Sequence, residues 1–236
     1  HNHAGIRIIP MQAAVRFQTP LFIWGETPWD ISGMYSADDY AEFNKRTVFE
    51  HDMRGYSRSD MIGKGGLTER DLRWCTMPSD EEYAVNKLRG IYIGNFFDWD
   101  PIIQTKLIIE KYDWEPARLP FERTYRNISN LDDMHENGVH DYMKWIKFGY
   151  GRCSDHASKD IRKGYLDRDE AIKLVEKYDH VKPYRDLNRW LSYVDMTEAE
   201  FDRIADTFRD PRVWSKDQED NWVKDDIRSF DLRRQA

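Results

Sequence analysis

The stretch GYGRCSDHASKDIR, residues 149–162, joins two helical segments and has the richest chemical content in the chain. A helix that begins near Arg152 would place Asp155, Lys159 and Arg162 on one side, because residues three or four apart share a helix face. This side could clamp a diphosphate or a sugar carboxylate, since guanidinium groups make planar bidentate contacts. The spacing is equally typical of a solvated face with an ion pair between Asp155 and Lys159.

Helical periodicity extends on both sides of this stretch. Apolar residues recur at i, i+3, i+4 and i+7, which predicts amphipathic helices over residues 139–146, 171–178, 187–194 and 201–208. Asp167 is a candidate N-cap, and Thr197 with Glu200 forms a capping-box signature. Charged residues dominate from residue 211 onward, where Trp214 and Trp222 are expected to anchor the segment.

The beginning of the chain predicts a helix followed by a strand. Residues 4–18 have helical spacing, and the apolar run LFIWG, residues 21–25, fits a buried parallel strand that ends at Glu26. In an open α/β sheet the carboxyl end of such a strand faces the ligand. An ordinary buried strand with a turn glycine is the alternative interpretation of the run.

A second strand is predicted over residues 90–97, which are rich in aromatic and β-branched side chains. Asp98 and Trp99 follow it and are expected to face a ligand more readily than Asp100. Asp100 is expected to act as the N-cap of a helix over residues 101–112, with proline in its first turn.

Three further patterns lie between these strands. Residues 37–53 predict a helix with an acidic first turn, and residues 68–74 predict a short one. The sequence GKGG, residues 63–66, could bring backbone amides to a phosphate. Its spacing matches neither GxxxxGK[ST] nor GxGxxG, so a plain loop is favoured.

Composition excludes several classes of protein. The chain has 236 residues, 40% hydrophobic and 33% charged, with a net charge of -7. This charge disfavours general binding to nucleic acids or anionic lipid. No apolar run approaches the roughly 18 to 20 residues that span a bilayer, and no signal-peptide pattern is present, so we expect a cytoplasmic protein without membrane insertion.

The cysteines and histidines predict no metal site. Cys75 and Cys153 are the only cysteines, and they are too far apart for a CxxC pair, so a disulfide framework is not expected either. No base partner for Cys153 can be identified from the sequence.

Several motifs together resemble the N-acetyl sugar amidotransferase family of bacterial surface-polysaccharide biosynthesis. They are HNHAGI at residues 1–6, PLFIWGE at 20–26, DWDP at 98–101, KFGYGRCSDHASKDIR at 147–162 and YLDRDEAIKLVEKYDH at 165–180. The resemblance covers nearly the whole chain. It implies an α/β remnant of a PP-loop sheet, of the adenine nucleotide alpha hydrolase type, followed by a mainly α-helical region.

The resemblance also implies a division of the chain and a reaction. Residues 1–30 would end the nucleotide-binding domain, 31–120 would form a mixed α/β substrate region, and 121–236 a helical carboxyl-terminal region. Such enzymes are ligases that convert the acetamido group of a nucleotide-linked sugar to an acetamidino group during O-antigen or lipopolysaccharide synthesis. ATP with Mg²⁺ activates the amide as an adenylylated imidate, and ammonia then displaces AMP.

A separate glutaminase partner is implied as the source of ammonia, and a homo-oligomer is left open. The ATP-binding SGGxDS loop of the family has no match here, so we expect the carboxyl-terminal part of such an enzyme, inactive alone. The resemblance points to catalytic roles for Glu26, Asp155 and His156, and to substrate binding by Asp98, Trp99, Tyr150, Arg152, Lys159 and Arg162. The alternatives are another PP-loop enzyme, such as a tRNA-modifying one, and a non-enzymatic helical interaction module.

Overall fold

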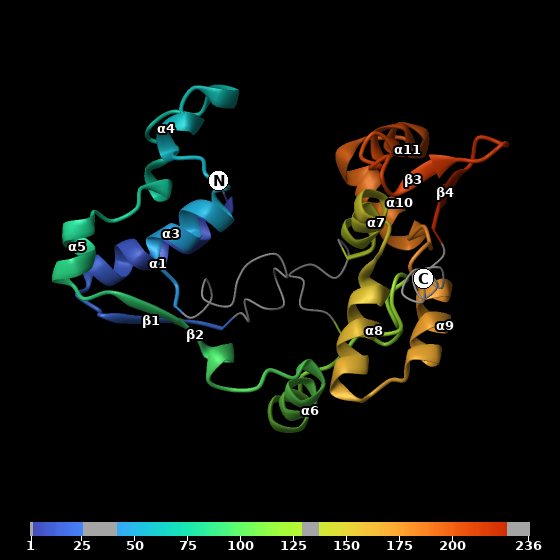
Figure 1. Ribbon diagram of the computed structural model, residues 1–236, viewed down its shortest axis with the longest axis horizontal. Coiled ribbons are helices and arrows are strands. Elements are labelled where there is room, and N and C mark those ends of the chain that lie inside the picture. Colours follow the sequence, from blue (N-terminus) through green and yellow to red (C-terminus); the bar gives the residue numbers. More distant parts are fainter. Residues whose placement is uncertain (1, 26–41, 129–136, 226–236) are drawn as a thin grey trace, which may run out of the picture. The chain divides into compact units, whose positions relative to one another are not determined.

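The computed structural model describes residues 2–25, 42–128 and 137–225 (Figure 1). The chain divides into two units, residues 1–107 and 108–236. The first contains a small parallel sheet, and the second is mainly helical, which confirms the predicted mixed α/β class. The predicted division at residues 30 and 120 stays a prediction.

The amino-terminal unit is organised around helix α1 (Asn2–Arg16) and a two-stranded sheet. Strand β1 (Leu21–Trp24) pairs in parallel with β2 (Arg89–Tyr92), with Ile23 opposite Ile91. Phe22 and Trp24 pack against a core built from α1 and the segments that follow.

Strand β1 is less buried than its sequence predicts. Leu21 is 44% exposed and Ile23 is 57% exposed. Among the described residues the sheet has only two strands, and the core covers the face with Phe22 and Trp24, so the other face stays open. The expectation of a strand buried on both faces was therefore wrong, whereas the parallel pairing was right.

Short helical turns make up the rest of this unit. They are α3 (Lys45–Thr47), a π-helix η2 (Val48–Asp52), α4 (Arg58–Met61), α5 (Asp80–Val85) and the 3₁₀ turns η3 (Lys64–Gly66), η4 (Arg73–Cys75) and η5 (Ile93–Asn95). Helix α6 (Pro101–Tyr112) ends the unit and continues into the next. Asp100 Oδ1 accepts hydrogen bonds from the amides of Ile102 and Ile103, as predicted for its N-cap.

Two predicted helices of this unit differ from the structure. Residues 37–41 lie outside the described residues. Among the residues that follow them, the helix begins at Lys45, because Phe43 pairs with Gly90 and Asn44 provides the N-cap. Residues 68–72 form a turn in which Thr68 Oγ1 donates to Asp71 at 2.6 Å. The predicted strand over residues 90–97 also ends early, at Tyr92, where η5 begins.

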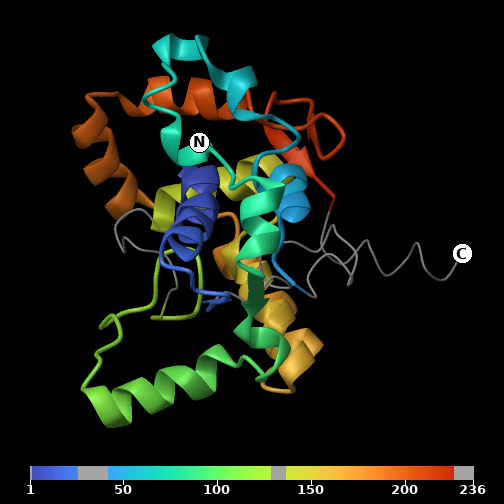
Figure 2. The ribbon, with the colours of Figure 1, turned by 90° about the vertical axis from the view of Figure 1, so that its left-hand side faces the viewer.

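The carboxyl-terminal unit confirms the predicted helices. They are α7 (Asn137–Phe148), α8 (Arg152–Lys163), α9 (Arg168–Tyr178), α10 (Tyr184–Val194) and α11 (Glu198–Asp206). Asp167 caps α9, and Thr197 and Glu200 form the capping box of α11. Helices α10 and α11 run in clearly different directions (Figure 2). Apolar residues of α7, α10 and α11 form one core around Ile146 and Leu187.

A hairpin over residues 214–224 was not predicted from the sequence. Strand β3 (Trp214–Lys216) pairs antiparallel with β4 (Trp222–Lys224). Trp214 is buried, and its Nε1 donates to the carbonyl oxygen of Ile146 at 2.8 Å, which confirms the predicted anchor.

Gly138, in the first turn of α7, allows a close approach to Asp186. A Cβ there would lie 2.5 Å from Asp186 Oδ2, and the Gly138 amide donates to the same oxygen at 3.0 Å. We expect Gly138→Ala to lower the free energy of unfolding by about 1–3 kcal/mol, because the buried Asp186 would have to move. Urea denaturation followed by circular dichroism measures the change.

Gly5→Ala is the matched control, because a Cβ at Gly5 would meet only Ile9, at 3.9 Å. Its stability should stay equal or rise, since alanine is the better helix former. A Gly138→Ala variant as stable as the unchanged protein would contradict the packing described.

Candidate functional site

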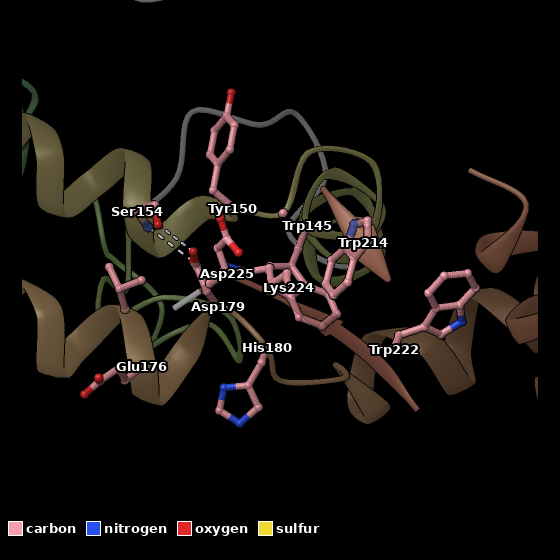
Figure 3. Close-up of a pocket in the computed structure, with 12 residues that line it drawn as sticks. Trp145, Tyr150, Ser154, Glu176, Asp179, His180, Trp214, Trp222, Lys224 and Asp225 are labelled. Carbon is pink, nitrogen blue, oxygen red and sulfur yellow. Dashed lines mark hydrogen bonds between the residues drawn. The ribbon is translucent and has the colours of Figure 1, made fainter. Parts of the chain in front are cut away.

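The Asp179 carboxylate caps helix α8 from outside that helix. It accepts hydrogen bonds from the amides of Gly151 at 2.8 Å and Ser154 at 3.2 Å, and Ser154 Oγ donates to it at 2.6 Å (Figure 3). A Cβ at Gly151 would lie 2.8 Å from Asp179 Oδ1, so the close approach requires glycine. A residue just after α9 thus satisfies the free amides of α8, where the helix dipole favours a negative charge.

Arg123 is buried beside this cap, with 1% of its surface exposed. Its guanidinium donates to the carbonyl oxygens of Asp179 and Val181 and lies 5.2 Å from the centre of the Tyr142 ring. Burial lowers the pKa of Arg123 to about 10, although the charges of Asp179 and Asp141 oppose the change. The residue remains a cation at neutral pH and ties its loop to the end of α9.

Arg152 and Asp155 take part in ion pairs between α7 and α8. Both Arg152 Nε and Arg152 Nη2 lie 2.9 Å from Asp141 Oδ1, while Asp155 pairs with Lys144 and lies 3.8 Å from Arg152. Burial alone would raise the pKa of Asp141, but hydrogen bonds from His140 and Arg152 hold it below its usual value. Arg152 is therefore already bound to a buried carboxylate.

His156 is buried on α8, with 8% of its surface exposed. Its Nδ1 lies 2.7 Å from Thr124 Oγ1. Burial, together with the positive charges of Arg126 and Arg152, lowers the pKa of His156 to about 2. The imidazole is neutral at physiological pH and contacts the loop at residues 121–127.

Asp160 fixes the same loop one turn further along α8. Both Arg126 and the Tyr125 hydroxyl donate hydrogen bonds to its carboxylate, and Arg126 and Asp160 are buried. Burial and the hydrogen bond to Asp160 raise the pKa of Tyr125. Nearby, burial raises the pKa of the fully buried Cys153 thiol to about 12, so it is not a thiolate nucleophile at neutral pH.

The remaining predicted residues of α8 are more accessible. Arg162 is exposed and donates to Ser158 Oγ at 2.8 Å, and Lys159 is half-buried. Tyr150 is exposed, with the Lys144 ammonium 4.7 Å from its ring centre. The helix begins at Arg152, which confirms that Asp155, Lys159 and Arg162 share a side.

Three predicted residues lie elsewhere. Glu26 is outside the described residues. Asp98 and Trp99 belong to the amino-terminal unit, where both are exposed between η5 and α6. Their assignment to a substrate site stays a prediction.

A pocket of about 470 Å³ lies in the carboxyl-terminal unit. Its apolar side chains are Trp145, Val175, Trp214 and Trp222, and its polar ones are Ser154, Glu176, Asp179, His180, Lys224 and Asp225. Tyr150 is the predicted site residue that reaches it, and Figure 3 shows its ring extending away from Trp145 and His180. The ends of α7, α8 and α9 and the hairpin β3–β4 thus contribute to one pocket.

Sequence reasoning missed the loop at residues 121–127, which supplies Arg123, Thr124 and Arg126 to these contacts. The loop has neither helical nor strand periodicity. The one feature of the sequence that could have indicated a functional loop is the pair Arg123 and Arg126, which flank a threonine and a tyrosine.

Two kinds of site are absent from residues 2–25, 42–128 and 137–225. No three His, Cys, Asp or Glu side chains gather there as a metal site. No helix in these ranges is both long and apolar enough to cross a membrane.

The fold and the site define a mixed α/β protein whose helical half holds a ligand-sized pocket. Residues 108–228 match the family model described as "LPS biosynthesis protein WbpG-like, C-terminal domain". The chain belongs to this family of lipopolysaccharide-biosynthesis proteins. Among curated proteins, none matches the chain.

Asp179→Asn removes the charge of the cap and keeps its shape. We expect it to lower the free energy of unfolding by about 3–5 kcal/mol, because the buried Arg123 would lose the larger of its two counter-charge interactions and keep only that with Asp141. Asp167→Asn is the matched control. Asparagine is as good an N-cap as aspartate, so this substitution at an exposed N-cap should change the free energy of unfolding by less than about 0.5 kcal/mol. If urea denaturation gives the same loss of free energy of unfolding for both variants, Asp179 does not stabilise the protein more than an ordinary N-cap does.

The buried His156 makes stability depend on pH. Its pKa falls from 6.5 to about 2 on folding, so below pH 6.5 only the unfolded chain binds the proton. The free energy of unfolding should therefore fall as the pH drops below 6.5, by up to about 1.4 kcal/mol per pH unit from this group.

His156→Gln should flatten this dependence between pH 6.5 and 5, whereas His180→Gln, on the exposed His180, should leave it unchanged. Urea denaturation at a series of pH values measures both. Parallel curves for the unchanged protein and His156→Gln would show that His156 is not the group responsible.

Proposed function

We propose that the chain is the carboxyl-terminal part of an ATP-dependent amidotransferase of lipopolysaccharide biosynthesis. The reaction would convert the acetamido group of a nucleotide-linked sugar to an acetamidino group, through an adenylylated imidate and with ammonia from a glutaminase partner. The observation that carries the proposal is the family match over residues 108–228. The long motifs at 147–162 and 165–180, which resemble N-acetyl sugar amidotransferases, lie inside that range.

The described residues do not fit ATP or Mg²⁺. They contain no cluster that would hold a metal ion. The GKGG segment forms a single exposed 3₁₀ turn with Gly63, Gly65 and Gly66 at positive φ, rather than a loop leading into a long helix. We therefore derive no step through either group, and both remain proposals for the natural full-length enzyme.

The contacts of α8 support different roles for its predicted residues. Lys159 is half-buried and Arg162 is exposed, and both are proposed to contact the diphosphate of the substrate. Arg152 and His156 are held by Asp141 and Thr124, and we propose that they position α8. Asp155 remains a proposed catalytic residue, and Tyr150 a proposed substrate contact.

Two other functions are less well supported. A tRNA-modifying enzyme would need a cationic surface for phosphate contacts, whereas this chain has a pI near 5.6. A helical interaction module without activity would account for the fold but not for the motifs that resemble those of amidotransferases.

A reconstituted reaction tests the proposal. The natural full-length protein, ATP, Mg²⁺, an ammonium salt and an N-acetylated nucleotide sugar should give a product with one additional positive charge, detected by mass spectrometry and electrophoresis. Lys159→Ala and Arg162→Ala should each raise KM for the sugar nucleotide by about three- to tenfold with little change in kcat, as expected for a lost charge-assisted contact.

Lys173→Ala is the matched control, because Lys173 is exposed on α9 and does not line the pocket. If KM is unchanged in all three variants, the proposed substrate contacts of Lys159 and Arg162 are wrong, but the proposed reaction is not contradicted. A complete enzyme that forms no amidine from any N-acetylated sugar nucleotide would contradict the function itself.

A further inference from the structure

The pocket beside α9 has a volume of about 470 Å³, within the range of about 300–1,000 Å³ typical of small-molecule sites. All its lining residues belong to the carboxyl-terminal unit. Lys159 and Arg162, the proposed diphosphate contacts, are not among them. The proposed diphosphate contacts therefore do not explain what this pocket binds.

One wall of the pocket is a set of fixed indole rings. Trp145 and Trp214 meet edge to face with their ring centres 4.8 Å apart. The Arg209 guanidinium lies 4.4 Å from the Trp214 ring and 5.1 Å from the Trp222 ring. Since a rigid aromatic wall loses little entropy on binding, it suits a flat, apolar ligand surface such as the C–H face of a sugar ring.

The polar groups of the pocket carry more negative than positive charge. Glu176 and Asp225 contribute carboxylates and Lys224 an ammonium, whereas the Asp179 carboxylate is already bonded to the α8 amides and has Arg123 as a counter-charge; His180 is exposed nearby (Figure 3). Carboxylates accept short, strong hydrogen bonds from hydroxyl groups. They repel phosphates in the same position, because like charges this close raise the energy of binding.

We propose that this pocket binds the uncharged, hydroxyl-bearing ring of the sugar and excludes its phosphate groups. The inference rests on the proposed function, which supplies a sugar as substrate. It goes further by separating the ring from the diphosphate, which would lie outside the pocket. The carboxylate of Glu176, on the exposed side of α9, extends away from Trp145 and Trp214 in Figure 3, and it is proposed to turn toward the pocket and accept hydrogen bonds from ring hydroxyls.

Saturation-transfer NMR on the 236-residue chain tests the proposal with three probes, the gluco, galacto and manno N-acetylhexosamines. At least one should receive saturation at its ring protons. Inorganic pyrophosphate should not displace it. Glu176→Gln should weaken its binding by about three- to tenfold, as expected for one weakened hydrogen bond.

Glu170→Gln is the matched control, because Glu170 is exposed on the same helix and does not line the pocket. Its sugar affinity should be unchanged. The proposal is overturned if none of the three sugars binds, if pyrophosphate displaces the sugar, or if the two glutamine variants bind alike.

These results are distinguishable from a failure of the proposed function. Amidine formation by the full-length enzyme without sugar binding to this pocket would refute the pocket alone. Sugar binding that Glu176→Gln weakens, in a protein whose complete form makes no amidine, would refute the amidotransferase alone and support the pocket.

Discussion

The hydrogen-bonded contact of the Asp179 carboxylate with the first amides of α8 is the constraint on which the carboxyl-terminal unit depends. It fixes where α8 begins, and with Arg123 it connects the loop at residues 121–127 to the end of α9. A buried carboxylate is costly unless hydrogen bonds and a counter-charge compensate it, and both are supplied here. The position of α8 in turn sets where Tyr150 and Ser154 meet the pocket.

Buried charges replace part of the apolar core in this unit. Asp186 serves α7 much as Asp179 serves α8, since each accepts a hydrogen bond from a glycine amide in or beside the first turn. Asp160 holds Arg126 from the next turn of α8. Such contacts have strict geometry, whereas apolar packing tolerates sliding, so they favour one arrangement of the helices over its neighbours. A chain with 40% hydrophobic residues thereby keeps a defined fold.

Local sequence predicted the helices well and the contacts between distant segments poorly. The stripes of α7, α9, α10 and α11 and the caps at Asp167 and Thr197 depend on residues within one or two turns, and the structure confirms them. The short turns near residue 70 and the hairpin of β3 and β4 have no such repeat. The site residues Arg123 and Thr124 come from an irregular loop. Their hydrogen bonds to Asp179 and His156 join positions 32 or more apart, so no local pattern could identify them.

The close approach of Gly151 to Asp179 also limits how this family can diverge. Any side chain at 151 would occupy the space of the carboxylate, and any residue shorter than aspartate at 179 would leave the α8 amides unsatisfied. Neither position can change first without an unstable intermediate sequence. The two residues are therefore expected to be inherited as a pair, and to vary together across related chains.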